Sequence, residues 1–168
     1  LWIGTWEAGL SLYNSEKDQF INFLPNKNDT NWIQAKSVNS IYEDRIGNIW
    51  LGTSDGVVLV NTSEFTDDTD YNNIVKKIRF RTFKTSRLKN DVWDINDWDE
   101  NNIVAASTTG IYLLERNNGK ISSLNIPPTS GLILDTVISL SMYREDKDRL
   151  WISSSFHGLF LVDQKTKT

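Results

Sequence analysis

A short segment that returns four times along the chain limits its possible folds more than any other feature. Each copy consists of five residues in order: an aliphatic residue, a Trp or Val, a third apolar residue and two small residues. The copies begin at Leu1, Ile49, Ile103 and Leu150, which gives steps of 48, 54 and 47 residues. A period of this length indicates one supersecondary unit per copy, each burying its apolar surface against the next.

Each complete copy contains four strand-like segments, denoted A, B, C and D in chain order. The Trp-containing segment is B, and C begins at a glycine followed by apolar residues, as in Gly56-Val57-Val58-Leu59-Val60. Segment A precedes B, as at residues 38–42, and segment D follows C, as at residues 78–83. The first copy lacks A and the last lacks D. The copies therefore divide the chain into residues 1–24 (BCD), 36–84 (ABCD), 90–126 (ABCD) and 135–164 (ABC).

These segments are predicted to be β-strands, because they are short, rich in β-branched and aromatic residues, and bounded by turn formers such as Asp55-Gly56. No stretch shows the apolar period of an amphipathic helix, so no helix is expected. Segments B and C are apolar at successive positions, which predicts sheets buried on both faces. The short connections leave no room for covering helices. Small antiparallel sheets stacked face to face around an axis, a β-propeller, fit this pattern.

The expected fold is all-β: one domain over residues 1–168 that forms a partial β-propeller of about 3.5 four-stranded antiparallel blades. It is expected to be an open arc of a larger ring of about seven blades. Because both terminal copies are short of one strand, the chain is interpreted as an excised segment, and its partners are expected to be the remaining blades of a longer parent. Alone, it would associate through exposed apolar faces, for example as a homodimer.

Glycines mark the turns. The B-to-C hairpins, which require a positive φ, carry Gly9, Gly56, Gly110 and Gly158. In the A-to-B turn of the second copy, Asp44 is expected to accept hydrogen bonds from following amides while Gly47 takes the left-handed conformation. Asn101 and Asp148 stand in the position of Gly47 in the later copies and are expected to take the same conformation.

Composition excludes several classes of protein. The 18 basic and 22 acidic side chains are spread along the chain and give a net charge of -4, so no nucleic-acid partner is expected. The alternating basic residues of 76–81 fit a half-exposed outer strand. The acidic run 67–70 lacks the Gly and Glu of a calcium loop, and without cysteine there is no disulfide or Cys-rich zinc site. No metal and no cofactor are expected.

The second copy resembles a known family. The matching residues are Val38, Ser40-Ile41, Glu43-Asp44, Gly47, Ile49-Trp50, Gly52-Thr53 and Gly56, and they are similar to the two-component-regulator propeller repeat. In that family such repeats form large propellers in the periplasmic sensor region of histidine kinases, often hybrid kinases of Bacteroidetes that regulate polysaccharide use. The resemblance implies a periplasmic segment that senses oligosaccharide for an inner-membrane kinase and is not itself an enzyme.

Several conspicuous side chains have a structural interpretation. Trp2, Trp50 and Trp151 share one position between apolar neighbours, which predicts packing between blades rather than ligand stacking. The single histidine, His157, has no clustered acidic residues for a metal site and no serine partner for a catalytic triad. Trp32 lies in the long connection 24–36 and could be tucked under it as a core residue.

The candidate binding site lies on one rim of the propeller, where B-to-C and D-to-A loops of successive blades converge. Aromatic residues there can stack on a sugar ring, and polar residues can hydrogen-bond its hydroxyl groups. The candidates are Trp6, Glu7, Asp55, Arg87, Asn90, Thr108, Phe156 and His157. Ordinary exposed turns would carry similar residues.

Two other functions remain open on the sequence. One is an interaction or dimerisation platform with no small-molecule site. The other is a glycan-cleaving enzyme, which needs two carboxylates within reach of one bond, and Glu7 with Asp55 on adjacent blades is the candidate pair.

Overall fold

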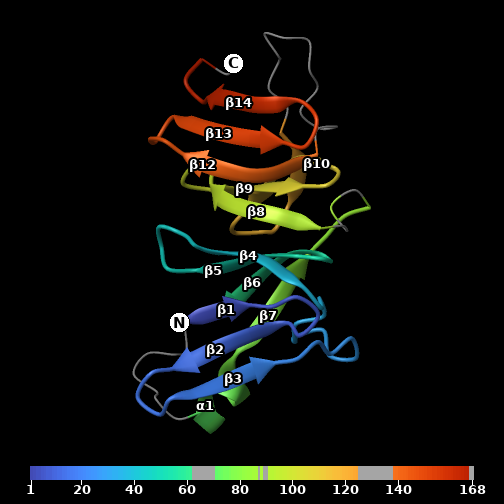
Figure 1. Cartoon of the computed structure of the whole chain (residues 1–168), viewed down its shortest axis with the longest axis vertical. Helices are drawn as coiled ribbons and strands as arrows, with labels where there is room; N and C mark the ends of the chain where they lie inside the picture. Colours follow the sequence, from blue (N-terminus) through green and yellow to red (C-terminus); the bar gives the residue numbers. More distant parts are fainter. Residues whose placement is uncertain (62–70, 87, 89–90, 125–137, 167–168) are drawn as a thin grey trace.

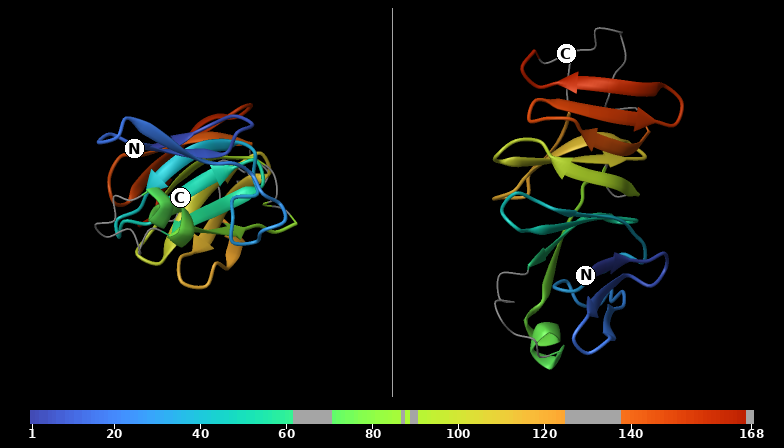
Figure 2. Two further views of the ribbon diagram at one scale, coloured as in Figure 1. Left: turned by 90° about the horizontal axis from the view of Figure 1, so that it is seen from below. Right: turned by 60° about the vertical axis from the view of Figure 1, so that its left-hand side comes forward.

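The structure is a computed structural model that describes residues 1–61, 71–86, 88, 91–124 and 138–166. Over these residues the chain forms fourteen strands and one short helix, and the strands make four antiparallel sheets. The sheets stack face to face along the long axis of the molecule, with the first sheet at the bottom of Figure 1 and the last at the top. The other views show the same open stack (Figure 2). The chain is therefore a partial β-propeller, as the repeat predicts.

Each sheet corresponds to one copy of the repeat and is called a blade. Blade 1 consists of β1 (Trp2–Gly4), β2 (Leu10–Asn14) and β3 (Gln19–Phe23). Blade 2 consists of β4 (Val38–Glu43), β5 (Ile49–Thr53), β6 (Gly56–Asn61) and β7 (Arg79–Phe83). Blade 3 consists of β8 (Val92–Asp97), β9 (Asn102–Ser107), β10 (Gly110–Glu115) and β11 (Ile121–Ser123). Blade 4 consists of β12 (Ser139–Arg144), β13 (Arg149–Ser154) and β14 (Gly158–Asp163). Strands adjacent in sequence pair within each blade.

A bulge marks the start of each A strand. The register of β4 shifts between Val38 and Ser40, that of β8 shifts between Val92 and Asp94, and β12 has the same irregularity. The facing B strand of blade 2 carries Gly52, where a Cβ atom would lie 2.3 Å from the Ser40 Oγ and 2.9 Å from the Val92 carbonyl oxygen. The glycine of the repeat therefore allows the A strand of the next blade to approach closely.

The B-to-C hairpins explain the remaining residues of the repeated motif. In blade 2 the Thr53 hydroxyl donates to the Gly56 carbonyl at 2.8 Å and accepts the Asp55 amide at 3.1 Å. In blade 3 the Ser107 hydroxyl likewise donates to the Gly110 carbonyl and accepts the Thr109 amide. Gly56 has a φ of 100°, and positive φ is confirmed for all four predicted hairpin glycines. The small hydroxyl residue at the end of strand B thus closes each of these turns.

The A-to-B turns differ between copies. Asp44 accepts the amides of Ile46 and Asn48, and Gly47 has a φ of 84°, as predicted. The expectation for Asn101 and Asp148 is wrong: among the described non-glycine residues, positive φ occurs only at Glu7 and Asp18. In blade 3 Asp99 instead accepts the amides of residues 101 and 102, and in blade 4 Asp146 accepts those of residues 148 and 149. The capping carboxylate has moved by one residue, and a left-handed residue is no longer needed.

Three apolar clusters fill the spaces between successive blades. Trp50 is completely buried between blades 2 and 3, where its ring lies 5.9 Å from that of Phe83, which confirms its predicted core role. Trp2 and Trp151, in the terminal blades, are partly buried. Trp32 packs on the first cluster and its Nε1 donates to the Leu24 carbonyl at 2.8 Å, so it is a core residue of its connection.

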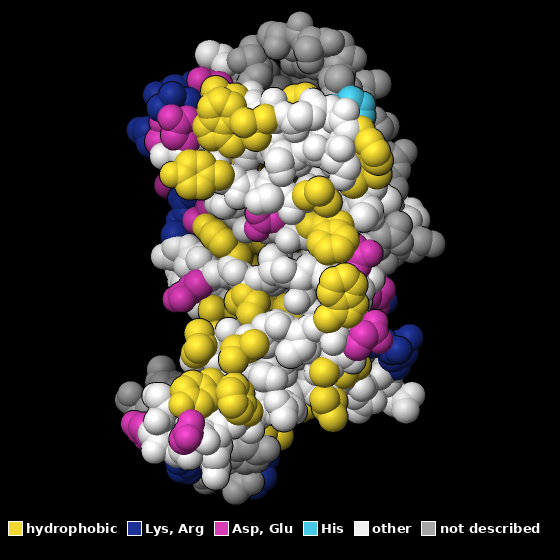
Figure 3. All heavy atoms as spheres, in the orientation of Figure 1, with side chains coloured by type: hydrophobic (Ala, Val, Ile, Leu, Met, Phe, Trp, Pro, Cys, Tyr) yellow, Lys and Arg dark blue, Asp and Glu magenta, His cyan; other side chains and the backbone are white. Residues whose placement is uncertain are grey.

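The outer faces of the terminal blades expose side chains that are buried elsewhere. Leu159 in blade 4 is 62% exposed, whereas Val57 and Ile111, at the same position of blades 2 and 3, are 0% exposed. Tyr143 in blade 4 and Phe20 in blade 1 are exposed as well. Figure 3 shows hydrophobic side chains at the surface near the top of the stack. These faces lack only the neighbouring blade that covers their counterparts inside the stack.

One helix was not predicted from the sequence. Helix α1 (Tyr71–Lys77) precedes β7, and its Ile74 is buried in the cluster between blades 1 and 2. Lys76 and Lys77 stand in its last turn, where positive charge is favoured by the helix dipole, so they do not belong to the outer strand. The acidic run 67–70 lies outside the described residues. Among the described residues, no helix is long and apolar enough to cross a membrane.

Candidate ligand-binding rim

A cavity of about 400 Å³ lies on the predicted rim, where the β1–β2 turn, the β5–β6 turn and the connection from blade 1 to blade 2 meet. We call it the rim groove. Its walls carry one aromatic residue, three carboxylates, two lysines, two serines, a glutamine and an alanine. The lining residues are Trp6, Glu7, Lys27, Gln34, Ala35, Lys36, Ser37, Ser54, Asp55 and Asp91. The volume falls within the range of about 300–1,000 Å³ that is usual for small-molecule sites.

The structure brings together three of the eight candidate residues, Trp6, Glu7 and Asp55. Thr108 is adjacent to the groove, because its amide donates to the carbonyl oxygen of Asp91 at 3.1 Å.

Other candidates lie elsewhere. Phe156, which is 79% exposed, and His157 stand on the β13–β14 turn of blade 4 and do not line the groove. His157, in cyan in Figure 3, marks that end of the rim. Arg87 and Asn90 lie outside the described residues.

The turn that carries Trp6 is held firmly against the next connection. The Thr5 hydroxyl donates to the Gly9 carbonyl at 2.7 Å, and the Gly9 amide donates to the Lys36 carbonyl at 2.8 Å. Glu7 takes a φ of 73°, and its amide donates to the Ser37 Oγ at 3.3 Å. The indole of Trp6 itself is 79% exposed. A flat aromatic surface is therefore presented to solvent by a fixed backbone, as stacking on a ligand ring requires.

The charges of the groove are largely balanced. Glu7 pairs with Lys36 at 3.4 Å, and Asp55 pairs with Lys84 at 2.8 Å. These pairs are partly exposed, so they contribute little to stability and remain available for rearrangement around a ligand.

Glycoside hydrolysis needs one carboxyl group held protonated as the general acid. The two lysine-paired carboxylates fit hydrogen bonding to hydroxyl groups better than that role. Among the described residues no group of three or more acidic, His or Cys side chains could hold a metal ion.

Residues of the connection between blades 1 and 2 were missed at the sequence level. Lys27, Gln34, Lys36 and Ser37 supply one wall of the groove. This connection has no repeated pattern, and only its contacts with the two hairpins place it there. The unusual length of the connection was the one available signal.

A buried ion cluster joins blades 2 and 3 away from the groove. Arg116 Nη1 lies 2.7 Å from Asp44 Oδ2, and Arg116 also pairs with Asp97. Burial by itself would raise the pKa of Asp44, but hydrogen bonds from Trp50, Asn48 and backbone amides outweigh it, and the pKa is lowered from its ordinary value of 3.8. The Trp50 Nε1 donates to the same carboxylate at 2.8 Å. Arg116 pairs with both carboxylates of this cluster, so the cluster holds the blades together and is not a ligand site.

Asp94 is a half-buried carboxylate at the junction of blades 3 and 4. Its Oδ2 accepts the Met142 amide at 2.6 Å and its Oδ1 accepts the Ile95 amide at 2.8 Å. Burial raises the pKa of this carboxyl group despite these hydrogen bonds. The bond to Met142 fixes β8 against β12, and the bond to Ile95 lies within the bulged strand β8, so the role of Asp94 is structural.

Comparisons with known proteins agree with the repeat. Residues 33–55, which include β4 and β5, match the family model described as two component regulator propeller. No curated protein matches the chain.

Solved structures share the fold over almost the whole chain. The extracellular domain of BT3049 from B. thetaiotaomicron, assigned to a hybrid two component system, has a TM-score of 0.60 at 17% identity and covers 98% of this chain and 26% of that one. The corresponding domain of BT4673 from the same organism has a TM-score of 0.66 at 16% identity and covers 97% and 19%. PorZ, an essential surface component of the type-IX secretion system of Porphyromonas gingivalis, has a TM-score of 0.62 at 14% identity and covers 98% and 24%.

Identities this low show a shared fold only, and the chain spans about a quarter or less of the length of these solved chains. The resemblance expected from the sequence is confirmed. The chain is a partial β-propeller whose second blade carries a two component regulator propeller repeat.

Proposed function

We propose that this chain is the ligand-sensing propeller segment of an extracytoplasmic sensor of a two-component system, and that its ligand is an oligosaccharide bound in the rim groove. The segment itself is non-catalytic, and the parent is a histidine kinase of the inner membrane whose sensor part faces the periplasm. The observation that carries the proposal is the exposed Trp6 beside Glu7, Asp55 and Gln34 in one groove between two blades.

This combination suits a sugar. A pyranose ring has an apolar face that packs on an aromatic side chain and hydroxyl groups that donate to carboxylates or accept from amides and lysines. The balanced ion pairs of the groove favour a ligand without net charge. The extracellular domains with the same fold belong to proteins assigned to two-component systems, which supports a sensor role for this segment.

An interaction platform is the second candidate, and the exposed outer faces of blades 1 and 4 favour it. Leu159, Leu161 and Tyr143 form an apolar surface on blade 4 that a further blade or a second copy would cover. PorZ, a surface component of a secretion system, has the same fold. This use of the terminal faces is compatible with ligand binding at the rim.

The test is binding of a panel of neutral and acidic glycans to the chain, followed by calorimetric titration of the strongest binder against variants. Trp6→Ala should weaken that binding roughly fivefold or more, because a stacking contact contributes about 1 kcal/mol or more. The unfolding transition should not change, since the indole is exposed.

Phe20→Ala is the matched control, because it removes an exposed aromatic ring outside the groove. It should leave the affinity unchanged. Equal binding by wild type and Trp6→Ala, or cleavage of the bound glycan, would contradict the proposal.

A further inference from the structure

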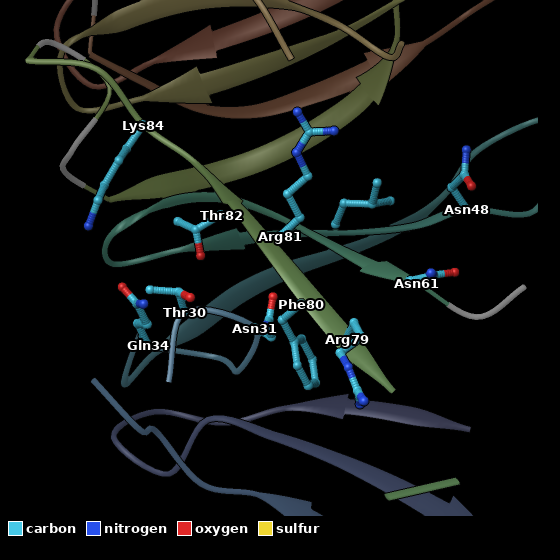
Figure 4. Close-up of a pocket in the computed structure, with 11 residues that line it drawn as sticks. Thr30, Asn31, Gln34, Asn48, Asn61, Arg79, Phe80, Arg81, Thr82 and Lys84 are labelled. Atoms are coloured by element: carbon cyan, nitrogen blue, oxygen red, sulfur yellow. The ribbon is translucent and has the colours of Figure 1, made fainter. Parts of the chain in front are cut away.

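A second, larger cavity of about 560 Å³ lies along the outer side of blade 2. We call it the lateral groove. It runs beside the last strand of the blade, β7, and Figure 4 shows that Thr30, Asn31 and Gln34 approach this strand from the connection between blades 1 and 2. The backbone of that connection is fixed to the strand, because the Phe80 amide donates to the Asn31 carbonyl at 2.9 Å.

The lining of the lateral groove combines polar side chains with the apolar Leu59 and Phe80, and it contains no acidic residue. Amides and hydroxyls come from both walls, and Arg79, Arg81 and Lys84 add cationic donors. The cations are already engaged: Arg79 donates to the carbonyls of Lys76 and Ile78, and Arg81 donates to the carbonyl of Asn118. In Figure 4 the two guanidinium groups point in opposite directions. They therefore do not converge on one anion, and the groove is best suited to a ligand rich in hydroxyl groups.

The two grooves are adjacent. Gln34 lines both of them, and Lys84, which lines the lateral groove, forms an ion pair of 2.8 Å with Asp55 of the rim groove. A polar path thus leads from Trp6 on the rim, past Gln34, to Thr30 and Asn31 on the outer side of blade 2. A compact ligand such as a disaccharide would occupy only one end of this path.

We infer that the lateral groove is a second subsite of the rim groove, and that the ligand is a linear, uncharged, hydroxyl-rich chain whose further units lie against Thr30 and Asn31. The inference rests on the proposed function, because it extends the same site. It predicts that affinity rises with chain length until both grooves are filled. It also predicts that substitutions of Thr30 and Asn31 weaken the binding of the longer chains only.

The experiment uses neutral oligosaccharides of one linkage type, about two to eight units long, prepared from the polysaccharide that binds best in the glycan panel. Titrations compare the wild-type chain with the double variant Thr30→Ala/Asn31→Ala. Two lost hydrogen bonds should reduce the affinity for the longest chain roughly tenfold or more and leave that for the disaccharide unchanged. Asn28→Ala, in the same connection but outside both grooves, is the matched control and should change neither.

The outcomes separate the two proposals. An affinity that is the same for the disaccharide and the longest chain, with no effect of the double variant, would overturn the second subsite while the rim site stands. A double variant that weakens all lengths equally would also overturn it, because the effect would then come from a general disturbance of the connection. Absence of any glycan binding, or tight binding of an extended peptide instead, would remove the proposed function and the inference together.

Discussion

Replacement of Trp50 by alanine should destabilise the chain more than any other single truncation in the repeated Trp position. The side chain is 0% exposed, packs against Phe83 and donates its Nε1 hydrogen to Asp44. A Trp or Phe to Ala change in a core costs about 3–5 kcal/mol, and a hydrogen bond to a charged group contributes a further 1.5 kcal/mol or so. We expect a loss of about 4 kcal/mol or more, out of the 5–15 kcal/mol typical of a domain.

Urea denaturation measures this loss. With a slope of about 2 kcal/mol/M, a loss of about 4 kcal/mol lowers the midpoint by about 2 M. Trp151→Ala is the matched control, because Trp151 has the same position in blade 4 but is only partly buried and donates to the exposed Glu145. It should cost about 2 kcal/mol or less. Equal midpoint shifts for the two variants would refute the argument that burial between two blades decides the cost.

Three further predictions concern the ion cluster and the blade 4 face. Arg116→Met should cost about 3 kcal/mol or more in urea denaturation, because it leaves the buried Asp44 without its cation; an unchanged midpoint would contradict this. Since the pKa of Asp44 is lowered in the folded chain, its stabilising contribution is present above the ordinary value of 3.8 and is lost as the pH falls through the folded value. The stability difference between wild type and Asp44→Asn should therefore be constant from about pH 7 to 5 and shrink below about pH 4, and a difference that grows on acidification would be inconsistent with the lowered pKa. Leu159→Lys should reduce concentration-dependent self-association in sedimentation velocity, whereas Ile46→Lys, at an exposed residue of an A-to-B turn, should not.

The strands could be predicted from the sequence because their signals are local. The Trp and Gly positions of the repeat fix strand B, the hairpin and strand C within a few residues, and Thr53 closes the turn between them. Helix α1 was missed because its seven residues are too short to show a helical period, and it is stabilised by Ile74 packing between two blades. The turns at Asn101 and Asp148 were predicted wrongly because a neighbouring Asp can cap the same turn in another register.

The site could be predicted only in part. Trp6, Glu7 and Asp55 lie on hairpins that the repeat places at one rim, and these three do line one groove. Gln34 and Lys36 belong to a connection without a repeated pattern, so only the tertiary structure reveals their contribution. The partnership of Asp44 with Arg116 spans 72 residues and joins two blades, and no local pattern encodes it.

The most direct test of the account is a map of the bound glycan on the chain by hydrogen–deuterium exchange. We predict slower exchange, on addition of the strongest binder from the panel, at the amides of the β1–β2 turn, the β5–β6 turn and residues 27–37, with the A-to-B turns unchanged. Protection confined to the outer face of blade 4, or no protection at the rim while the glycan is bound, would contradict the claim that the ligand binds at this rim.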